Sequence, residues 1–268
     1  ELEKTIEMKD ELLLLITHEL KTPLSVITSS IQAIESICKN ELTDRVGKYL
    51  NKIRQNTYRQ LKLVNNILDN TRVKSGLFKL NQTNVDVVNL TSMIIESIMV
   101  CAERKKIKVS FSSALDRMII KADVDQYERV LLNLLSNAVK FTPEEKSIEV
   151  KIFQFVKNGT QRACIQIKDQ GIGIPNDKKE YIFERFGRVD KLNAGNAEGT
   201  GIGLYLVKML VDLMDGEIEL ESEEGTGSIF TLIFPLLSSA IEHASIEKPN
   251  ERLATAAAIE FSDIYYRV

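Results

Sequence analysis

The sequence has few of the features that would place it outside the cell or in a membrane. Its three cysteines, Cys38, Cys101 and Cys164, lie far apart and form no C-x-x-C pair. Without a secretory signal peptide, we expect them to be free thiols in a reducing, cytoplasmic compartment. No apolar run approaches the roughly 20 residues of a membrane-spanning helix. Because the sequence starts at Glu1 inside a helical pattern, we expect a piece of a longer chain, with any membrane anchor elsewhere.

The sequence also lacks a strong bias in charge. The net charge is -3 over 268 residues, so no general attraction to nucleic acid or to an anionic membrane is expected. The hydrophobic content of 44% and the charged content of 27% are typical of globular proteins. The length suggests about two domains.

Histidine is scarce, and one of the two, His18, lies among several reactive groups. Residues 12–28 read LLLLITHELKTPLSVIT, with apolar residues at helical spacing. Glu19 can hold one ring N–H of the imidazole and leave the other nitrogen nucleophilic. Thr22 lies one turn further on the same face, and Pro23 is expected to bend the helix just past His18. A solvated surface histidine is the usual interpretation, but this density of groups favours a reactive one.

Two long helical patterns fill the first part of the chain. The first runs from Glu1 to about Cys38 and the second from about Arg45 to Val73, with a polar break between them. Such a short connection predicts an antiparallel hairpin. The apolar stripe continues through most of both helices, so we expect two copies to pack as a four-helix bundle. The alternative is that the hairpin packs on the downstream domain of its own chain.

Beyond a glycine-containing hinge near residue 76, the pattern becomes mixed α and β. We expect a helical hairpin over residues 1–75, a mixed domain over 76–237 and a tail over 238–268, which makes the fold class α+β. In the mixed domain the patterns predict helices over 89–104, 125–141 and 203–214, and strands over 108–112, 118–122, 147–156, 162–168, 216–221 and 228–234.

The predicted helix over 125–141 carries a polar stripe beside its apolar face. Asn133, Asn137 and Lys140 follow one another at helical spacing. An amide oxygen can ligate Mg²⁺, which keeps waters and phosphate oxygens in its shell, and an ammonium suits phosphates. An ordinary solvated helix face is the alternative.

Two glycine-rich elements make a nucleotide the better interpretation. Residues 169–175, DQGIGIP, follow a predicted strand; Asp169 can accept a hydrogen bond from an exocyclic amine, and Gly171 and Gly173 let the backbone approach a flat ring. Residues 198–204, EGTGIGL, open a helix whose backbone N–H groups can hold phosphates. The sequence has no P-loop motif, and the second element does not directly follow a strand, which argues against a dinucleotide-binding fold.

These motifs resemble those of the sensor histidine kinases of two-component signalling. THELKTPL at 17–24 is similar to the family's H box, with Thr17 where Ser is usual. Four further motifs resemble the family's N, G1, F and G2 boxes and occur in the same order. They are NLLSNAVKFTP at 133–143, DQGIGI at 169–174, FERF at 183–186 and GTGIGL at 199–204. Gly187 departs from the family, where an aromatic residue is frequent after the F box, and this puts the rigidity of the lid in question.

The resemblance implies a dimeric phosphoacceptor hairpin joined to an α/β sandwich of the Bergerat (GHKL) type that binds ATP and Mg²⁺. It implies an ATP-dependent protein histidine kinase that phosphorylates His18, with Glu19 beside it. The implied partners are a second copy of the chain and the receiver domain of a response regulator, and not nucleic acid. The H-E-x-x-T pattern, which ends at Thr22, is associated in the family with phosphatase activity toward that regulator.

The resemblance also implies roles in the nucleotide site. It assigns Asp169 to the adenine amine, Asn137 with Asn133 to Mg²⁺, and Lys140 to the phosphates. The further nucleotide contacts that it implies are Gly171, Gly173, Ile174, Phe186, Gly199, Thr200, Gly201, Gly203 and Leu204. Phe183 and Phe186 would anchor a lid over about 187–199, and Arg185 or Arg188 would stabilise the transferred phosphoryl group.

Two other functions compete with this interpretation. A chaperone-like or topoisomerase-like ATPase of the same nucleotide fold would have no use for THELKTPL, and a catalytically silent scaffold would have no use for the intact N-box and glycine motifs.

The tail could form a helix over 251–265 with Leu253, Ala257, Phe261 and Ile264 near one face. A frayed or locally docked tail is favoured over a partner-binding helix. About thirty residues are too few for a receiver domain.

Overall fold

The computed structural model describes residues 2–39, 41–74, 78–187, 201–237 and 251–265. Its contacts divide the chain into two compact units. The hairpin unit comprises residues 1–79 with 258–268, and the sandwich unit comprises residues 80–257. Among the described helices, none combines the length and the apolar character needed to cross a membrane.

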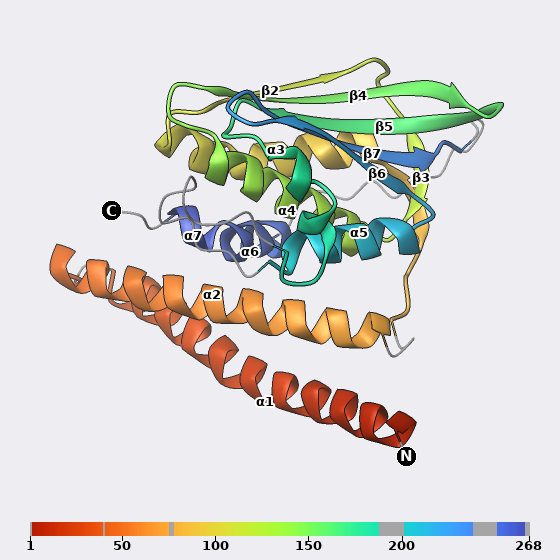
Figure 1. Cartoon of the computed structure of the whole chain (residues 1–268). Coiled ribbons are helices and arrows are strands. Elements are labelled where there is room, and N and C mark those ends of the chain that lie inside the picture. The colour runs from red at the N-terminus through yellow and green to blue at the C-terminus, as the bar shows by residue number, and fades with distance from the viewer. Residues whose placement is uncertain (1, 40, 75–77, 188–200, 238–250, 266–268) are drawn as a thin grey trace. The chain divides into compact units, whose positions relative to one another are not determined.

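Two long helices make up most of the hairpin unit (Figure 1). They are α1, Leu2–Ile37, and α2, Asp44–Lys74, so both predicted helices are confirmed. Pro23 lies inside α1, and the helix continues beyond it to Ile37. The Arg54 guanidinium of α2 donates two hydrogen bonds of 2.7 Å to the Glu35 carboxylate of α1, which ties the two helices together.

The C-terminal residues form two short helices, α6, Glu251–Glu260, and α7, Ser262–Tyr265. A helix was predicted over this range, and the structure divides it at Phe261, whose side chain is fully buried. Within the hairpin unit, Lys62 of α2 forms a 2.9 Å ion pair with Glu260, and Gln55 Nε2 donates to the Ser262 carbonyl at 3.3 Å. These contacts support the prediction of a locally docked tail.

The sandwich unit contains a five-stranded sheet in the order β2-β4-β5-β7-β6. Strands β2 and β4 are parallel, and the other neighbours are antiparallel. The strands are β2 Lys108–Ser113, β4 Ser147–Lys157, β5 Thr160–Asp169, β6 Glu217–Glu223 and β7 Gly227–Pro235. A separate antiparallel pair joins β1, Thr83–Asp86, to β3, Ile119–Ala122. Every predicted strand is present, whereas β1 was not predicted.

Three helices cover one face of the large sheet (Figure 1): α3 Val87–Arg104, α4 Val124–Phe141 and α5 Gly203–Leu213. Two begin with an aspartate cap: Asp86 Oδ1 accepts from the Val88 N–H at 3.1 Å, and Asp123 Oδ1 from the Gln126 N–H at 3.2 Å. The core is formed by buried aliphatic side chains of helices and strands, among them Leu131, Leu134, Leu135, Ile148, Val150 and Ile165. The predicted helical region followed by an α/β sandwich is therefore confirmed.

Candidate functional site

Asp169 lies at the end of β5 and is 7% exposed. Its Oδ1 accepts hydrogen bonds from the backbone N–H groups of Gly171 at 2.8 Å and Ser228 at 3.3 Å. Burial raises the pKa of Asp169 above the usual value for aspartate, and the two backbone hydrogen bonds oppose this shift. Both of these bonds go to Oδ1, which leaves Oδ2 to accept a hydrogen bond from a ligand.

The turn after Asp169 approaches other backbone segments very closely. Gly173 has φ +67°, and a Cβ there would lie 1.9 Å from the Glu223 carbonyl oxygen. A Cβ at Gly171 would lie 2.9 Å from the Phe141 carbonyl oxygen at the end of α4. Both glycines are therefore needed for this packing, as well as for any approach of a flat ring.

The β6–β7 turn supports this glycine turn from behind, and the sequence did not reveal it. The Ile174 N–H donates to Ser222 Oγ at 2.9 Å, and Ser222 Oγ donates to the Gly227 carbonyl at 2.9 Å. A Cβ at Gly227 would lie 2.1 Å from the Asp169 carbonyl oxygen. The glycines at 225 and 227, which separate the predicted strands over 216–221 and 228–234, were the available signal.

The polar stripe of α4 meets the start of α5. Asn133 is 5% exposed, and its Oδ1 accepts from Asn137 Nδ2 at 3.4 Å. A Cβ at Gly203 would lie 2.8–2.9 Å from the side-chain amide atoms of Asn133, so the G2 and N motifs are in contact. Among the described residues no group of three or more His, Cys, Asp or Glu side chains could hold a metal ion. The role of Asn133 and Asn137 as Mg²⁺ ligands stays a prediction.

The F-box residues lie next to the G2 motif. The Phe183 ring packs edge-on against Phe230, with centroids 6.4 Å apart. Phe186 is 55% exposed and has φ +66°, and its N–H donates to the Gly201 carbonyl at 2.9 Å. The Arg185 guanidinium lies 4.9 Å from the centroid of the Phe186 ring. Phe183 thus anchors this segment by packing and Phe186 by its backbone.

The unusual Gly187 has a local explanation. A Cβ at this position would lie 1.9 Å from the Tyr181 carbonyl oxygen, so a larger residue would require a different backbone.

Ile174 and Leu204, at the edges of the two glycine motifs, are half-buried. Three predicted site residues, Arg188, Gly199 and Thr200, lie outside the described residues, as does most of the predicted lid.

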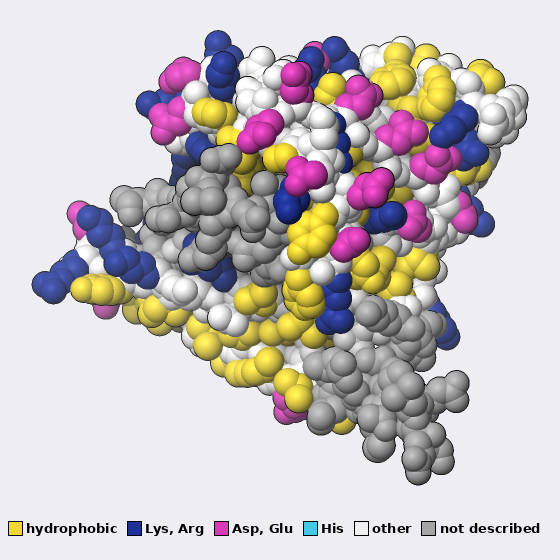
Figure 2. Space-filling view, viewed as in Figure 1, with side chains coloured by type: hydrophobic (Ala, Val, Ile, Leu, Met, Phe, Trp, Pro, Cys, Tyr) yellow, Lys and Arg dark blue, Asp and Glu magenta, His cyan; other side chains and the backbone are white. Residues whose placement is uncertain are grey.

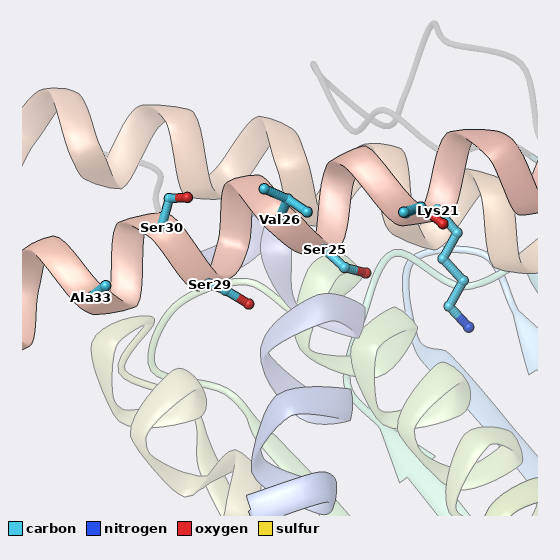
Figure 3. Close-up of a pocket in the computed structure, with 7 residues that line it drawn as sticks. Lys21, Ser25, Val26, Ser29, Ser30 and Ala33 are labelled. Carbon is cyan, nitrogen blue, oxygen red and sulfur yellow. The ribbon is translucent and has the colours of Figure 1, made fainter.

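The THELKTPL motif lies on α1. His18 is part of this helix, and its side chain is outside the described part of the chain. Glu19 and Thr22 are exposed. A groove runs along α1 from this point (Figure 3), lined by Lys21, Thr22, Ser25, Val26, Ser29, Ser30 and Ala33. The helix surface that follows His18 therefore carries mostly small side chains.

Two family matches cover both regions. Residues 8–76 match the family described as the His Kinase A (phospho-acceptor) domain. Residues 122–238 match the family described as histidine kinase-, DNA gyrase B- and HSP90-like ATPase. The chain therefore belongs to the sensor histidine kinases, and it contains the two regions of a protein histidine kinase.

Individual relatives agree with this assignment. The chain is 34% identical over 242 residues to hybrid signal transduction histidine kinase D of Dictyostelium discoideum, covering 88% of this chain and 15% of that protein. It is 32% identical over 237 residues to sensor histidine kinase YclK of Bacillus subtilis (strain 168), covering 88% and 48%. The crystal structure of full-length ShkA in complex with AMPPNP matches with a TM-score of 0.69 at 27% identity, covering 94% of this chain and 54% of ShkA. The chain thus spans about half or less of the length of these relatives.

Proposed function

We propose that this chain is the cytoplasmic core of an ATP-dependent protein histidine kinase, in which ATP bound to the sandwich unit phosphorylates His18. The observation that carries the proposal is that α4 meets both glycine motifs in the sandwich unit: Asn133 contacts Gly203, and Phe141 contacts Gly171, which is bonded to Asp169. These groups are far apart in the sequence, and together they offer an acceptor for an amine, amide oxygens for a metal and a helix N-terminus for phosphates.

In this proposal Asp169 recognises the base. Its Oδ2 accepts from the adenine amine while Oδ1 stays bonded to Gly171 and Ser228. The narrow turn through Gly171, Gly173 and Ile174 lies against the ring. The buried pair of backbone donors fixes the orientation of the carboxylate, which favours an amine over a carbonyl at that position of the base.

The phosphates lie along α4 and at the start of α5. The Asn137 amide, oriented by its hydrogen bond to Asn133, offers its oxygen to Mg²⁺, and Lys140 contributes a positive charge. Gly201, Gly203 and Leu204 place backbone N–H groups toward the phosphates. The family resemblance adds Gly199 and Thr200, which lie outside the described residues. Bound Mg²⁺ would neutralise phosphate charge. Arg185 or Arg188 supplies a further cation, since phosphoryl transfer depends mostly on positioning and charge stabilisation.

On α1, His18 is the nucleophile. A neutral imidazole can attack phosphorus through the ring nitrogen that carries no proton. The adjacent Glu19 is the proposed partner for the other ring N–H, which would orient the ring. His243, the second histidine, stands in the sequence E-H-A-S, with a glutamate before it but without the E-L-K-T-P run that follows His18.

The hairpin unit supports the proposal of a homodimer. Large apolar side chains on both helices are exposed, including Leu15 at 64%, Leu20 at 49% and Ile53 at 48%. Figure 2 shows hydrophobic side chains gathered along this part of the molecule. Packing two hairpins as a four-helix bundle would bury such side chains.

The groove on α1 supports the proposal that a receiver domain docks beside His18. Figure 3 shows Lys21, Ser25 and Ser29 projecting from one side of the helix. Small side chains there let a partner approach the helix backbone. A receiver docked to accept the phosphoryl group on an aspartate would also bring that aspartate near Thr22. The Thr22 hydroxyl could then orient a water for dephosphorylation.

The proposal is tested by following phosphate and oligomeric state together. With γ-labelled ATP and Mg²⁺ the wild type should become labelled, whereas Asn137→Ala should lose the label and remain a dimer in size-exclusion chromatography with light scattering. A monomeric Asn137→Ala variant of unchanged stability would contradict the assignment of dimerisation to the hairpin and ATP to the sandwich. An unlabelled wild type that hydrolyses ATP would favour the mechanical ATPase instead.

A further inference from the structure

The ammonium group of Lys105, the residue directly after α3, contacts the C-terminal end of α4. Lys105 Nζ donates to the Val139 carbonyl at 2.7 Å and to the Lys140 and Thr142 carbonyls at 2.8 Å. Carbonyls at the end of a helix have no partner inside the helix, and a cation there also interacts favourably with the helix dipole. Lys105 therefore caps the helix that carries the nucleotide-binding stripe.

The backbone cannot provide this cap itself. At the end of many helices, the N–H group of the residue after the C-cap donates a hydrogen bond to one of the last carbonyls. Here the C-cap is Thr142, in an extended conformation with ψ 127°, and the next residue is Pro143, which has no N–H. Thr142 is fully buried, so water has poor access to this end of the helix. The lysine takes the place of the missing backbone donor.

The capped turn forms part of the nucleotide site. Lys140 belongs to this turn, and Asn137 lies three residues before it, slightly less than one helical turn. The Phe141 carbonyl oxygen lies 2.9 Å from the place of a Cβ at Gly171, so the helix end and the turn after Asp169 meet backbone to backbone. A displacement of this turn would move the phosphate-facing stripe and the base-facing turn together.

Lys105 is itself held in place. It is the C-cap residue of α3, and its neighbours join that turn to the segment after α4. The Glu145 N–H donates to the Lys106 carbonyl at 3.1 Å, and the Lys108 N–H donates to the Lys146 carbonyl at 3.0 Å. The ammonium group is therefore supplied from a fixed backbone position.

We infer that Lys105 is a positioning residue for the nucleotide: by capping α4 it sets where Asn137, Lys140 and the Gly171 turn lie relative to one another. The inference rests on the proposed function, because it concerns the affinity of the same site. Lys105 does not contact the nucleotide in this account, so its loss should affect binding of ATP rather than the chemistry at saturating ATP.

The test compares the initial rate of autophosphorylation against ATP concentration for the full chain and three variants, below their unfolding transitions. Lys105→Met should raise the apparent KM for ATP about fivefold, equivalent to about 1 kcal/mol, with the saturating rate within twofold of wild type. Lys105→Arg keeps the charge and donors and should restore KM to within twofold. Lys106→Met is the matched control, since it removes an adjacent charge paired with Glu144 at the surface.

An unchanged KM in Lys105→Met, even with a lower melting temperature, would overturn the inference and leave Lys105 a purely structural cap. An equal rise in Lys106→Met would overturn it in favour of a general charge effect. If Lys105→Met does not fold, Lys105→Gln replaces it, with a rise in KM of at least twofold expected and an unchanged KM contradicting the inference. A wild type that binds no ATP would instead refute the proposed function.

Discussion

Gly173 and Gly159 offer a matched pair that isolates the close packing behind the nucleotide site. Both have positive φ, +67° and +76°, so an alanine at either position adopts the same unfavourable region. That conformation costs an alanine about 1 kcal/mol. A Cβ at Gly159, at the tip of the β4–β5 hairpin, meets nothing within 4 Å, whereas one at Gly173 lies 1.9 Å from the Glu223 oxygen.

The clash at Gly173 involves backbone and cannot be relieved by rotating a side chain. The distance to Glu223 O would have to grow from 1.9 Å to about 3.4 Å, ordinary van der Waals contact. That displacement breaks the hydrogen bonds from Gly225 N to Ile172 O, at 2.7 Å, and from Ile174 N to Ser222 Oγ, at 2.9 Å. At about 1 kcal/mol for each bond, Gly173→Ala should lower the free energy of unfolding by about 3 kcal/mol, against about 1 kcal/mol for Gly159→Ala.

Urea unfolding followed by circular dichroism measures the stabilities, and titration calorimetry measures ATP affinity. Gly159→Ala should bind ATP as the wild type does, while Gly173→Ala should bind at least tenfold more weakly because the base-facing turn has moved. Equal losses of stability in the two variants, or wild-type ATP affinity in Gly173→Ala, would refute this account of the turn.

Two further predictions concern individual side chains. Because burial raises the pKa of Asp169, its ionisation opposes folding as pH rises through that pKa. Asp169→Asn should therefore be at least as stable as wild type at pH 7, and any gain in stability should be gone below about pH 3.8. The variant should also bind ATP at least tenfold more weakly in calorimetry. A variant less stable than wild type at pH 7 would contradict this prediction. Thr22→Ala should autophosphorylate but clear phosphate from a phosphorylated regulator severalfold more slowly with ADP present, whereas Thr22→Ser should stay active; equal clearance by Ala and wild type would leave Thr22 only a structural role.

Local sequence patterns were sufficient for most of the fold. The long periodic stripes predicted α1 and α2 to within a few residues, and the alternating patterns over 147–156 and 162–168 predicted β4 and β5. The unpredicted strand β1 has only four residues, reads TNVD and pairs with β3, so it has no apolar alternation to identify it.

The candidate site could be proposed from the sequence only where a residue type itself indicates its chemistry. Asp169, Asn137 and the glycines stand in recognisable spacing, and the structure brings Asn133 against Gly203. The supports were not predictable, because they depend on contacts between distant segments. Ser222 holds Ile174 from another strand, and Lys105 looks like any exposed lysine after a helix until the end of α4 is placed beside it.

In the proposed reaction His18 receives the γ-phosphoryl group of ATP. The direct measurement incubates wild type and His18→Gln with γ-labelled ATP and Mg²⁺ and then exposes the protein to acid and to base. The wild type should carry label that is lost in acid and kept in base, as for a phosphoramidate. His18→Gln should carry no label and should still bind ATP with wild-type affinity in calorimetry. Label retained by the variant, or acid-stable label on the wild type, would contradict the claim.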